Sequence, residues 1–165
     1  RLLKGFEAFK DQTQSKTKLV IVGTKMFGTK TMEATYRKMR HKNDVLFVGR
    51  KEPEELKGIY GAARALVFVP YFEGFGIPLV EAMNCDIPIL TSNVTSLPEI
   101  AGDAAVYAEP ESPGSIRDGM VRIVKEKGLR EELIAKGKER RKLYSWDNTA
   151  SELWKTIERV LHKDA

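Results

Sequence analysis

Short apolar segments alternate with amphipathic segments along most of this chain. The segments "TKLVIVG" (17–23), "DVLFVG" (44–49), "ALVFVP" (65–70), "IPILTS" (87–92) and "AAVYAEP" (104–110) are apolar and mostly rich in β-branched residues. Runs of this length and composition predict buried strands. Because the strands do not alternate polar and apolar positions, helices should cover both faces of the sheet, which is typical of parallel sheets.

Segments with helical spacing separate these strands. The predicted helices cover 2–9, 31–42, 52–63, about 76–83 and 97–101, and the chain is predicted to be helical from about residue 112 to its end. Strands that alternate with helices predict a doubly wound α/β fold, in which a parallel sheet has helices on both faces. The sequence therefore predicts one Rossmann-like domain over residues 1–165, with C-terminal helices from about residue 112.

The first predicted helix leads directly into a strand, so a strand is expected before that helix. In the common strand order 3-2-1-4-5-6, the first strand is a central one. The chain also begins with "RLLKGFEAFK", without an initiator methionine. We therefore expect a fragment that lacks its first strand and whose sheet has a gap.

Composition restricts the class of protein and its location. The chain has 165 residues, 42% of them hydrophobic, and a single cysteine, Cys85, which excludes an internal disulfide and suits a reducing compartment such as the cytoplasm. The net charge of +5 is spread out and is densest over residues 121–143. This basic region is interpreted as the solvated face of two helices, and the alternative is a surface that favours phosphate-bearing ligands or peripheral contact with an anionic membrane face. Nucleic acid is not expected, because the one aromatic residue at this region, Tyr144, lies directly after it and there is no stacking series.

The loop after the strand at 65–70 has the composition of a ligand site. The stretch "YFEGFGIPLVEAM" runs from Tyr71 to Met83 and leads into a helix. In open parallel sheets, ligands bind beyond the carboxyl ends of the strands. Gly74 and Gly76 let the backbone take unusual conformations and let a ligand approach closely. The free N–H groups at the start of the helix form a ready site for a phosphate.

Two glutamates flank this predicted phosphate site. Glu73 lies on the loop, and Glu81 lies inside the helix, where its side chain can point back toward the loop. A carboxylate accepts paired hydrogen bonds from vicinal hydroxyls, as an acidic residue does for ribose in dinucleotide-binding folds. N–H groups that can bind a phosphate, with a carboxylate on either side, suit a sugar nucleotide as the ligand.

The string "EGFGIPLVEAM", followed by "CDIPILTSNVTSLPEIAGDAA", resembles the carboxyl-terminal domain of the GT-B retaining glycosyltransferases of group 1, numbered family four. Glu73 and Glu81 match the E-x7-E motif of that family. The later string "YSWDNTA" resembles the family's step into its last helix. The resemblance covers nearly the whole chain.

The resemblance implies a role for each residue that matches the motif. Glu81 would bind the ribose hydroxyls, and Glu73 would act as the catalytic residue beside the donor sugar. Backbone N–H groups would face the sugar and the diphosphate at four positions: Gly74, Phe75, Gly76 and Ile77.

Two further segments would border the same crevice. The strand end with Val48, Gly49 and Arg50 would lie beside the nucleobase, and a turn that contains Ser96 and Leu97, preceded by Thr95, would lie nearby. A structural explanation also exists for this turn, because Ser96 and Glu99 have the spacing of a capping box at the start of a helix.

The implied activity is transfer of a sugar from a nucleotide-diphosphate sugar to a hydroxyl of a glycan or a lipid. The acceptor would be bound by an N-terminal domain that this chain does not include. No cofactor and no metal are expected, because His41 and His162 stand in polar helical surroundings and no cluster has metal-ligand spacing.

One departure from the family affects the expected activity. The family's Gly-Arg and Lys-Asn elements, whose Arg and Lys hold the diphosphate, precede the first helix and are absent here. We therefore expect the fragment alone to transfer no sugar and to bind nucleotide weakly or not at all. A non-catalytic nucleotide-binding or scaffolding module of the same fold is an alternative. A glycosidase that uses Glu73 and Glu81 as its carboxylate pair ranks low, because both lie within one loop–helix unit.

Three residues outside the motif are predicted to pack in the core. They are Cys85, Trp146 and Trp154. In the resembled family the last helix crosses toward the other domain, which would leave part of the apolar face of this helix exposed.

Overall fold

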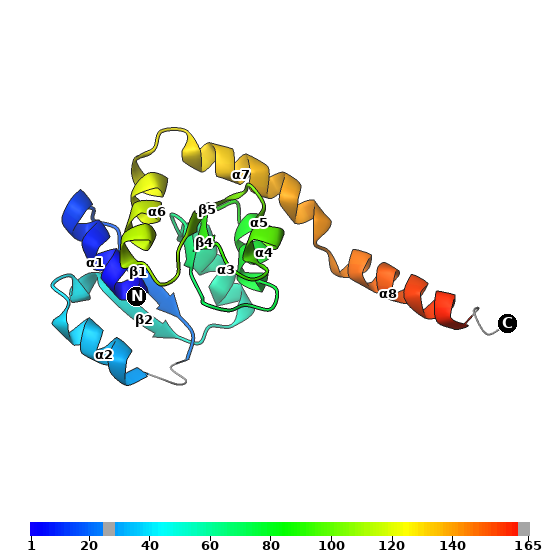
Figure 1. The fold of residues 1–165 in the computed structure, drawn as a ribbon, viewed down its shortest axis with the longest axis horizontal. Helices are drawn as coiled ribbons and strands as arrows, with labels where there is room; N and C mark the ends of the chain where they lie inside the picture. The colour runs from blue at the N-terminus through cyan, green and yellow to red at the C-terminus, as the bar shows by residue number, and fades with distance from the viewer. Residues whose placement is uncertain (25–28, 162–165) are drawn as a thin grey trace.

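The computed structural model describes residues 1–24 and 29–161, and its strands are all parallel (Figure 1). The strands are β1 (Leu19–Val22), β2 (Val45–Gly49), β3 (Leu66–Phe68), β4 (Ile89–Ser92) and β5 (Ala105–Ala108). Each observed strand lies within a predicted apolar segment and is shorter than it.

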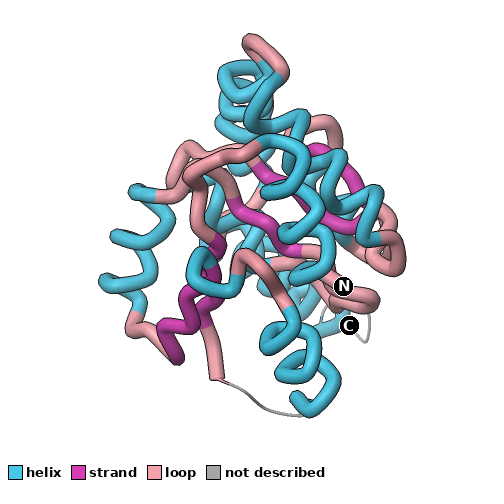
Figure 2. Tube along the Cα trace, turned by 90° about the vertical axis from the view of Figure 1, so that its left-hand side faces the viewer, coloured by secondary structure: helices cyan, strands magenta, loops and turns pink. Residues whose placement is uncertain are grey.

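Helices connect these strands and surround them (Figure 2). The helices are α1 (Leu2–Thr13), α2 (Thr29–Lys38), α3 (Pro53–Ala62), α4 (Ile77–Asn84), α5 (Leu97–Ala101), α6 (Pro113–Lys125), α7 (Leu129–Arg140) and α8 (Trp146–Leu161), with 3-10 turns η1 (Lys42–Asp44) and η2 (Arg141–Leu143). The predicted order of strands and helices is confirmed.

Helix α2 ends earlier than the sequence predicts. It stops at Lys38, whereas the pattern extended the helix to residue 42. Carboxylates of α1 hold the residues that follow: the backbone N–H of Arg40 donates to Glu7 Oε1 at 2.7 Å, and His41 Nε2 lies 2.9 Å from Asp11 Oδ1. The Arg40 N–H therefore has a side-chain partner on α1 in place of a helical one, and the His41 ring is tied to the same helix.

Successive residues of a strand enter two different cores, which confirms the doubly wound fold. Leu90 packs in a core with helices α1 and α6, whereas its neighbour Ile89 packs with helices α4 and α5. The same alternation occurs on β5, where Val106 enters the first core and Tyr107 the second. Helices therefore cover both faces of this part of the sheet, as the continuous apolar strands predicted.

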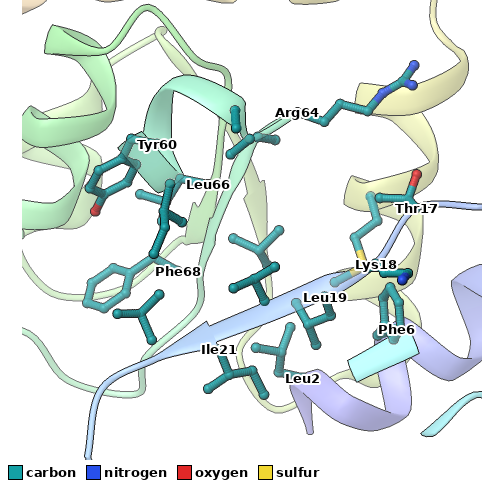
Figure 3. Close-up of a pocket in the computed structure, with 18 of the residues that line it drawn as sticks. Leu2, Phe6, Thr17, Lys18, Leu19, Ile21, Tyr60, Arg64, Leu66 and Phe68 are labelled. Carbon is teal, nitrogen blue, oxygen red and sulfur yellow. The ribbon is translucent and has the colours of Figure 1, made fainter. Parts of the chain in front are cut away.

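The strands form two separate sheets, with β1 beside β2 and β3 beside β4 and β5. The register pairs Leu19 with Val45 in the first sheet and Leu66 with Ile89 in the second. An apolar cavity of about 780 Å³ lies between β1 and β3 (Figure 3). The predicted gap in the sheet is therefore present.

One face of the smaller sheet differs from the prediction. Val20 and Leu46 are paired neighbours on β1 and β2, and they are 42% and 39% exposed. The opposite face carries Leu19 and Ile21, which pack against the core that α1 and α6 share. The expectation that helices cover both faces of every strand is therefore wrong for β1 and β2, whose face with Val20 and Leu46 is largely exposed.

Helix α8 projects away from the rest of the molecule (Figure 1). Trp146 is 84% exposed and Trp154 is 60% exposed, so the prediction that both tryptophans pack in the core is wrong. The body of the fold ends at Tyr144, whose hydroxyl lies 3.1 Å from the carbonyl oxygen of Ile100. Beyond that anchor, the apolar side chains of α8 have no core to enter. Across residues 1–24 and 29–161, no helix has the length and apolar character needed to cross a bilayer.

Candidate functional site

The loop between β3 and α4, which we call the motif loop (residues 71–76), ends on a glycine that no other residue could replace without strain. Gly76 has φ +108°, a conformation that residues with a Cβ rarely adopt. A Cβ at this position would also lie 2.9 Å from Leu97 Cδ2. Gly74 has no left-handed φ, and nothing within 4 Å would meet a Cβ there. The predicted unusual backbone is therefore confirmed for Gly76 and wrong for Gly74, where only open space for a ligand remains.

Helix α4 begins directly after this glycine, with Ile77 and Pro78 in its first turn. Proline is well placed there, because the first N–H groups of a helix have no partner inside it. No side chain caps this end of α4. Pro78 has no N–H, and the Leu79 N–H donates to the Gly76 carbonyl oxygen at 2.9 Å, so the Ile77 N–H is the donor of this turn that faces the carboxyl edge of β3, where the sequence predicted a phosphate site.

Ser96, the residue before α5, and Leu97, the first residue of α5, support the motif loop. The Ser96 hydroxyl lies 3.0 Å from the carbonyl oxygens of both Glu73 and Phe75. It makes no hydrogen bond to the N-terminus of α5, so the capping-box explanation is wrong. Leu97 is fully buried against Gly76. Thr95, the preceding residue, has φ +57°, a strained conformation for a β-branched residue and one that is common at functional sites.

The two motif glutamates stand in different surroundings. Glu73 lies on the loop, half-buried, with Oε1 3.5 Å from the backbone nitrogen of Phe75. Glu81 lies inside α4, also half-buried, and its Oε2 accepts a hydrogen bond of 2.9 Å from the Tyr60 hydroxyl. One carboxylate therefore belongs to a loop, and the other is held by a neighbouring helix.

Tyr60, near the end of α3, is a site residue that the sequence analysis missed. Its ring is buried, and burial together with the negative charge of Glu81 raises the pKa of its hydroxyl. The hydroxyl therefore stays protonated and donates to Glu81 across the pH range of most assays. Leu56 and Tyr60 have helical spacing, which marks Tyr60 as an inward-facing position with a hydroxyl in need of a partner. That spacing could have identified the residue, although not its partner.

The predicted nucleobase segment lies at the same edge of the fold but across the gap. Gly49 ends β2 with φ +69°, and Gly49 and Arg50 are both exposed. Val48 lines the cavity between β1 and β3, and Glu81 lines the same cavity from the other side. The structure thus brings Ser96 and Leu97 into contact with the motif loop, and it places Gly49 and Arg50 on the far side of the gap.

Aromatic side chains connect the motif loop with its surroundings. The Phe75 ring meets the Tyr144 ring edge-on, with 5.8 Å between the ring centroids. This contact joins the loop to the segment that leads into α8. On the same loop Phe72 is 79% exposed, and Ile77 is exposed at the start of α4. Tyr144 is a contact of the motif loop that the sequence analysis did not assign to the site.

The titratable residues of the described chain form no metal-ligand cluster. Over residues 1–24 and 29–161, no group of three or more His, Cys, Asp or Glu side chains is arranged to hold a metal ion. His41 instead pairs with Asp11 at the surface, and His162 lies outside the described residues. Cys85 is partly buried and packs against the core around α4, as predicted. The expectation of a reaction without metal stays a prediction.

The sequence model of one family, described as "Glycosyl transferases group 1", matches residues 1–140. O-antigen chain mannosyltransferase B of Escherichia coli is 30% identical over 151 residues, which are 92% of this chain and 40% of that protein. The chain therefore spans less than half the length of this relative.

Solved structures agree with the fold. Sucrose-phosphate synthase of Thermosynechococcus elongatus superimposes with a TM-score of 0.82 at 23% identity, over 98% of this chain and 42% of that one. Anabaena Alr3699/HepE, solved in complex with UDP and glucose, has a TM-score of 0.79 at 15% identity, over 96% of this chain and 44% of that one. The fold is that of one part of the GT-B glycosyltransferases, as the motif predicted. By its family match over residues 1–140, the chain belongs to the glycosyl transferases group 1 family.

Proposed function

We propose that this chain is the donor-binding domain of a retaining glycosyltransferase. The complete polypeptide would transfer a sugar from a nucleotide-diphosphate sugar to a hydroxyl acceptor. The observation that carries the proposal is the unit of motif loop and α4, which presents two separately held carboxylates and an uncapped helix N-terminus at the carboxyl edge of β3. Ligands of open parallel sheets bind at this edge.

In this proposal the carboxylates of Glu73 and Glu81 contact different parts of the sugar nucleotide. Glu81 binds the ribose hydroxyls, because Tyr60 orients its carboxylate and leaves further lone pairs for the ligand. Glu73 lies beside the donor sugar, where its negative charge stabilises the positive charge that develops at the reacting carbon. The backbone N–H groups of Gly74, Phe75, Gly76 and Ile77 face the sugar and the diphosphate. Gly49 and Arg50 border the base, and the reaction needs no metal.

The partners of the reaction follow from the relatives and remain proposals for this chain. The Anabaena neighbour was solved with UDP and glucose, which supports a nucleotide sugar as the donor. The Escherichia coli relative is an O-antigen chain mannosyltransferase, which supports polysaccharide assembly and a glycan or lipid-linked acceptor. We place the acceptor on an N-terminal domain and the enzyme in the cytoplasm, with peripheral membrane contact through the basic region at 121–143.

The test is a binding and transfer assay on the complete polypeptide that carries this chain. Nucleoside diphosphates and their sugar forms are titrated by calorimetry, and the anomeric configuration of the product is read by NMR. We expect binding of one nucleoside diphosphate and a product that keeps the donor's configuration. Binding without any transfer would favour the non-catalytic module. A failure of all nucleotides to bind would contradict the donor site. For residues 1–165 alone we expect no transfer and weak nucleotide binding or none.

Tyr60→Phe is expected to weaken binding of the nucleotide sugar about three- to tenfold, because the variant loses the uncharged hydroxyl that donates a hydrogen bond to the Glu81 carboxylate. Turnover at saturating donor should change little, since Tyr60 acts on Glu81 and not on the reacting atoms. The measurement is the separate determination of KM and kcat in the complete polypeptide.

Tyr107→Phe is the matched control for this variant. Its hydroxyl donates to the carbonyl oxygen of Gly102 at 2.5 Å, so the variant also loses the hydrogen bond of a partly buried tyrosine, but away from Glu81. The positioning role of Tyr60 would be rejected if both variants had the same KM for the donor.

A further inference from the structure

Phe75 connects the motif loop with two other parts of the fold. Its backbone nitrogen lies 3.5 Å from Glu73 Oε1, and its carbonyl oxygen lies 3.0 Å from the Ser96 hydroxyl. Its ring meets the Tyr144 ring edge-on, at an interplanar angle of 89°. A displacement of the Phe75 ring would therefore also displace the N–H group that lies beside the Glu73 carboxylate.

Tyr144 is itself held by the C-terminal end of α5. Its hydroxyl lies 3.1 Å from the carbonyl oxygen of Ile100 and 3.3 Å from that of Glu99. The last carbonyl groups of a helix have no partner inside it and accept hydrogen bonds from elsewhere. The Arg140 guanidinium donates to the same two oxygens and lies over the Tyr144 ring, 5.9 Å from its centroid. The α5 carbonyls and Arg140 together hold the Tyr144 ring in one orientation.

Helix α5 closes these contacts into a ring. At its N-terminal end, the Ser96 hydroxyl meets the carbonyl oxygen of Phe75, and Leu97 packs against Gly76. At its C-terminal end, α5 holds the Tyr144 hydroxyl, and the Tyr144 ring returns to Phe75. The motif loop therefore has one support on its backbone, from Ser96, and one on a side chain, from Tyr144.

Tyr144 stands where the chain leaves the body of the fold to become α8 (Figure 1). Leu143 before it and Trp146 after it are 59% and 84% exposed. Tyr144 is partly buried and packs against the core around α4 and α5. Of these three residues it is the one that turns inward, and its ring meets the loop that carries Glu73.

We propose that Tyr144 is a positioning residue for Glu73. Its ring holds Phe75, and the Phe75 N–H holds the Glu73 carboxylate beside the donor sugar. The inference deepens the proposed function and rests on it, because it takes Glu73 as the carboxylate that stabilises the transition state. A displacement of about 1 Å in a reacting group can cost about 100-fold in rate, so a side chain that acts only through Phe75 can control turnover.

The test is Tyr144→Leu in the complete polypeptide. Leucine keeps an apolar side chain against the core and removes both the aromatic edge and the hydroxyl. We expect kcat to fall about 10- to 30-fold. Affinity for the nucleoside diphosphate should change less than about twofold, because Ile77 and Glu81 belong to α4 and not to the motif loop. Tyr144→Phe keeps the aromatic edge and should retain kcat within about threefold of the parent.

Tyr36→Leu is the matched control. Tyr36 of α2 meets Phe47 of β2 edge-on at 89°, with 5.2 Å between the ring centroids. This variant also breaks an edge-on aromatic pair, but away from the motif loop, so its kcat should stay within about twofold of the parent. An equal fall of kcat in Tyr36→Leu and Tyr144→Leu would show a general loss of stability and overturn the inference.

A second series tests whether Tyr144 acts through Glu73. In a Glu73→Gln background, Tyr144→Leu should lower kcat no further, since the charge that it positions is already absent. Phe75→Leu removes the same ring contact from the loop side, so it should lower kcat in the same way and keeps the test available if Tyr144→Leu does not fold.

The outcomes separate this inference from the proposed function. If Glu73→Gln lowers kcat but Tyr144→Leu and Phe75→Leu do not, or if the effects of Tyr144→Leu and Glu73→Gln add in full, the positioning role is overturned and the proposed function stands. If Glu73→Gln leaves kcat unchanged, or if the parent transfers no sugar, the proposed function itself fails and the inference falls with it.

Discussion

Replacing Glu73 by glutamine is expected to lower turnover about 100- to 1,000-fold in the complete polypeptide, while donor affinity changes little. The substitution keeps the shape of the side chain and removes its negative charge. In the proposed site this negative charge stabilises the positive charge that develops in the transition state. Its loss therefore raises the activation barrier more than it weakens binding of the donor in the ground state. Steady-state kinetics with the nucleotide sugar, varied up to saturation, measures this difference.

The Glu73→Gln result can be interpreted only if the substitution leaves the structure of the motif loop unchanged. The backbone carbonyl of Glu73, and not its carboxylate, meets the Ser96 hydroxyl, so glutamine leaves that support unchanged. Glu132→Gln on α7 serves as the control, since it removes a charge from an exposed ion pair with Lys136. A Glu73→Gln enzyme with the parent's turnover would show that Glu73 takes no part in the chemistry.

Replacing Glu81 by glutamine is expected to weaken binding of the nucleoside diphosphate about 10- to 100-fold. A hydrogen bond to a charged group contributes about 1.5–3 kcal/mol, and the ribose offers two hydroxyls to this carboxylate. Glutamine can still accept the hydrogen bond from Tyr60, so the variant isolates the loss of charge from any movement of α3. Calorimetric titration with the nucleoside diphosphate measures the change.

Combining Glu81→Gln with Tyr60→Phe gives a matched test of this assignment. Because the two side chains share one hydrogen bond, their effects on affinity should not add. Strict additivity would mean that Tyr60 and Glu81 act on the ligand independently. An unchanged affinity in the Glu81→Gln variant would remove Glu81 from the donor site.

The turn into α4 and the short helix at 97–101 could be predicted from sequence, because both depend on residues that are close together in the chain. Gly76 opens α4 with a left-handed backbone, and the glycine–proline spacing marks that turn without any tertiary information. The short helix at 97–101 was predicted with its observed bounds. The gap between β1 and β3 was predicted from the common strand order of doubly wound sheets, and the two separate sheets confirm it.

Other parts depend on contacts between distant segments, which no local pattern encodes. The hydrogen bond between Tyr60 and Glu81 joins two helices, and the Ser96 hydroxyl turns to the motif loop instead of capping its own helix. The exposure of Trp154 was mispredicted for a related reason. An apolar helix face indicates burial against something, and the surface that covers it need not belong to the same segment of chain.

The most direct test of the donor site is a crystal structure of the complete polypeptide with its nucleotide sugar. We predict that the ribose hydroxyls lie within hydrogen-bonding distance of Glu81, that the diphosphate faces the N–H groups of Gly76 and Ile77, and that the sugar lies beside Glu73. A donor bound away from the motif loop, or bound with its ribose at Glu73 and its sugar at Glu81, would contradict the account.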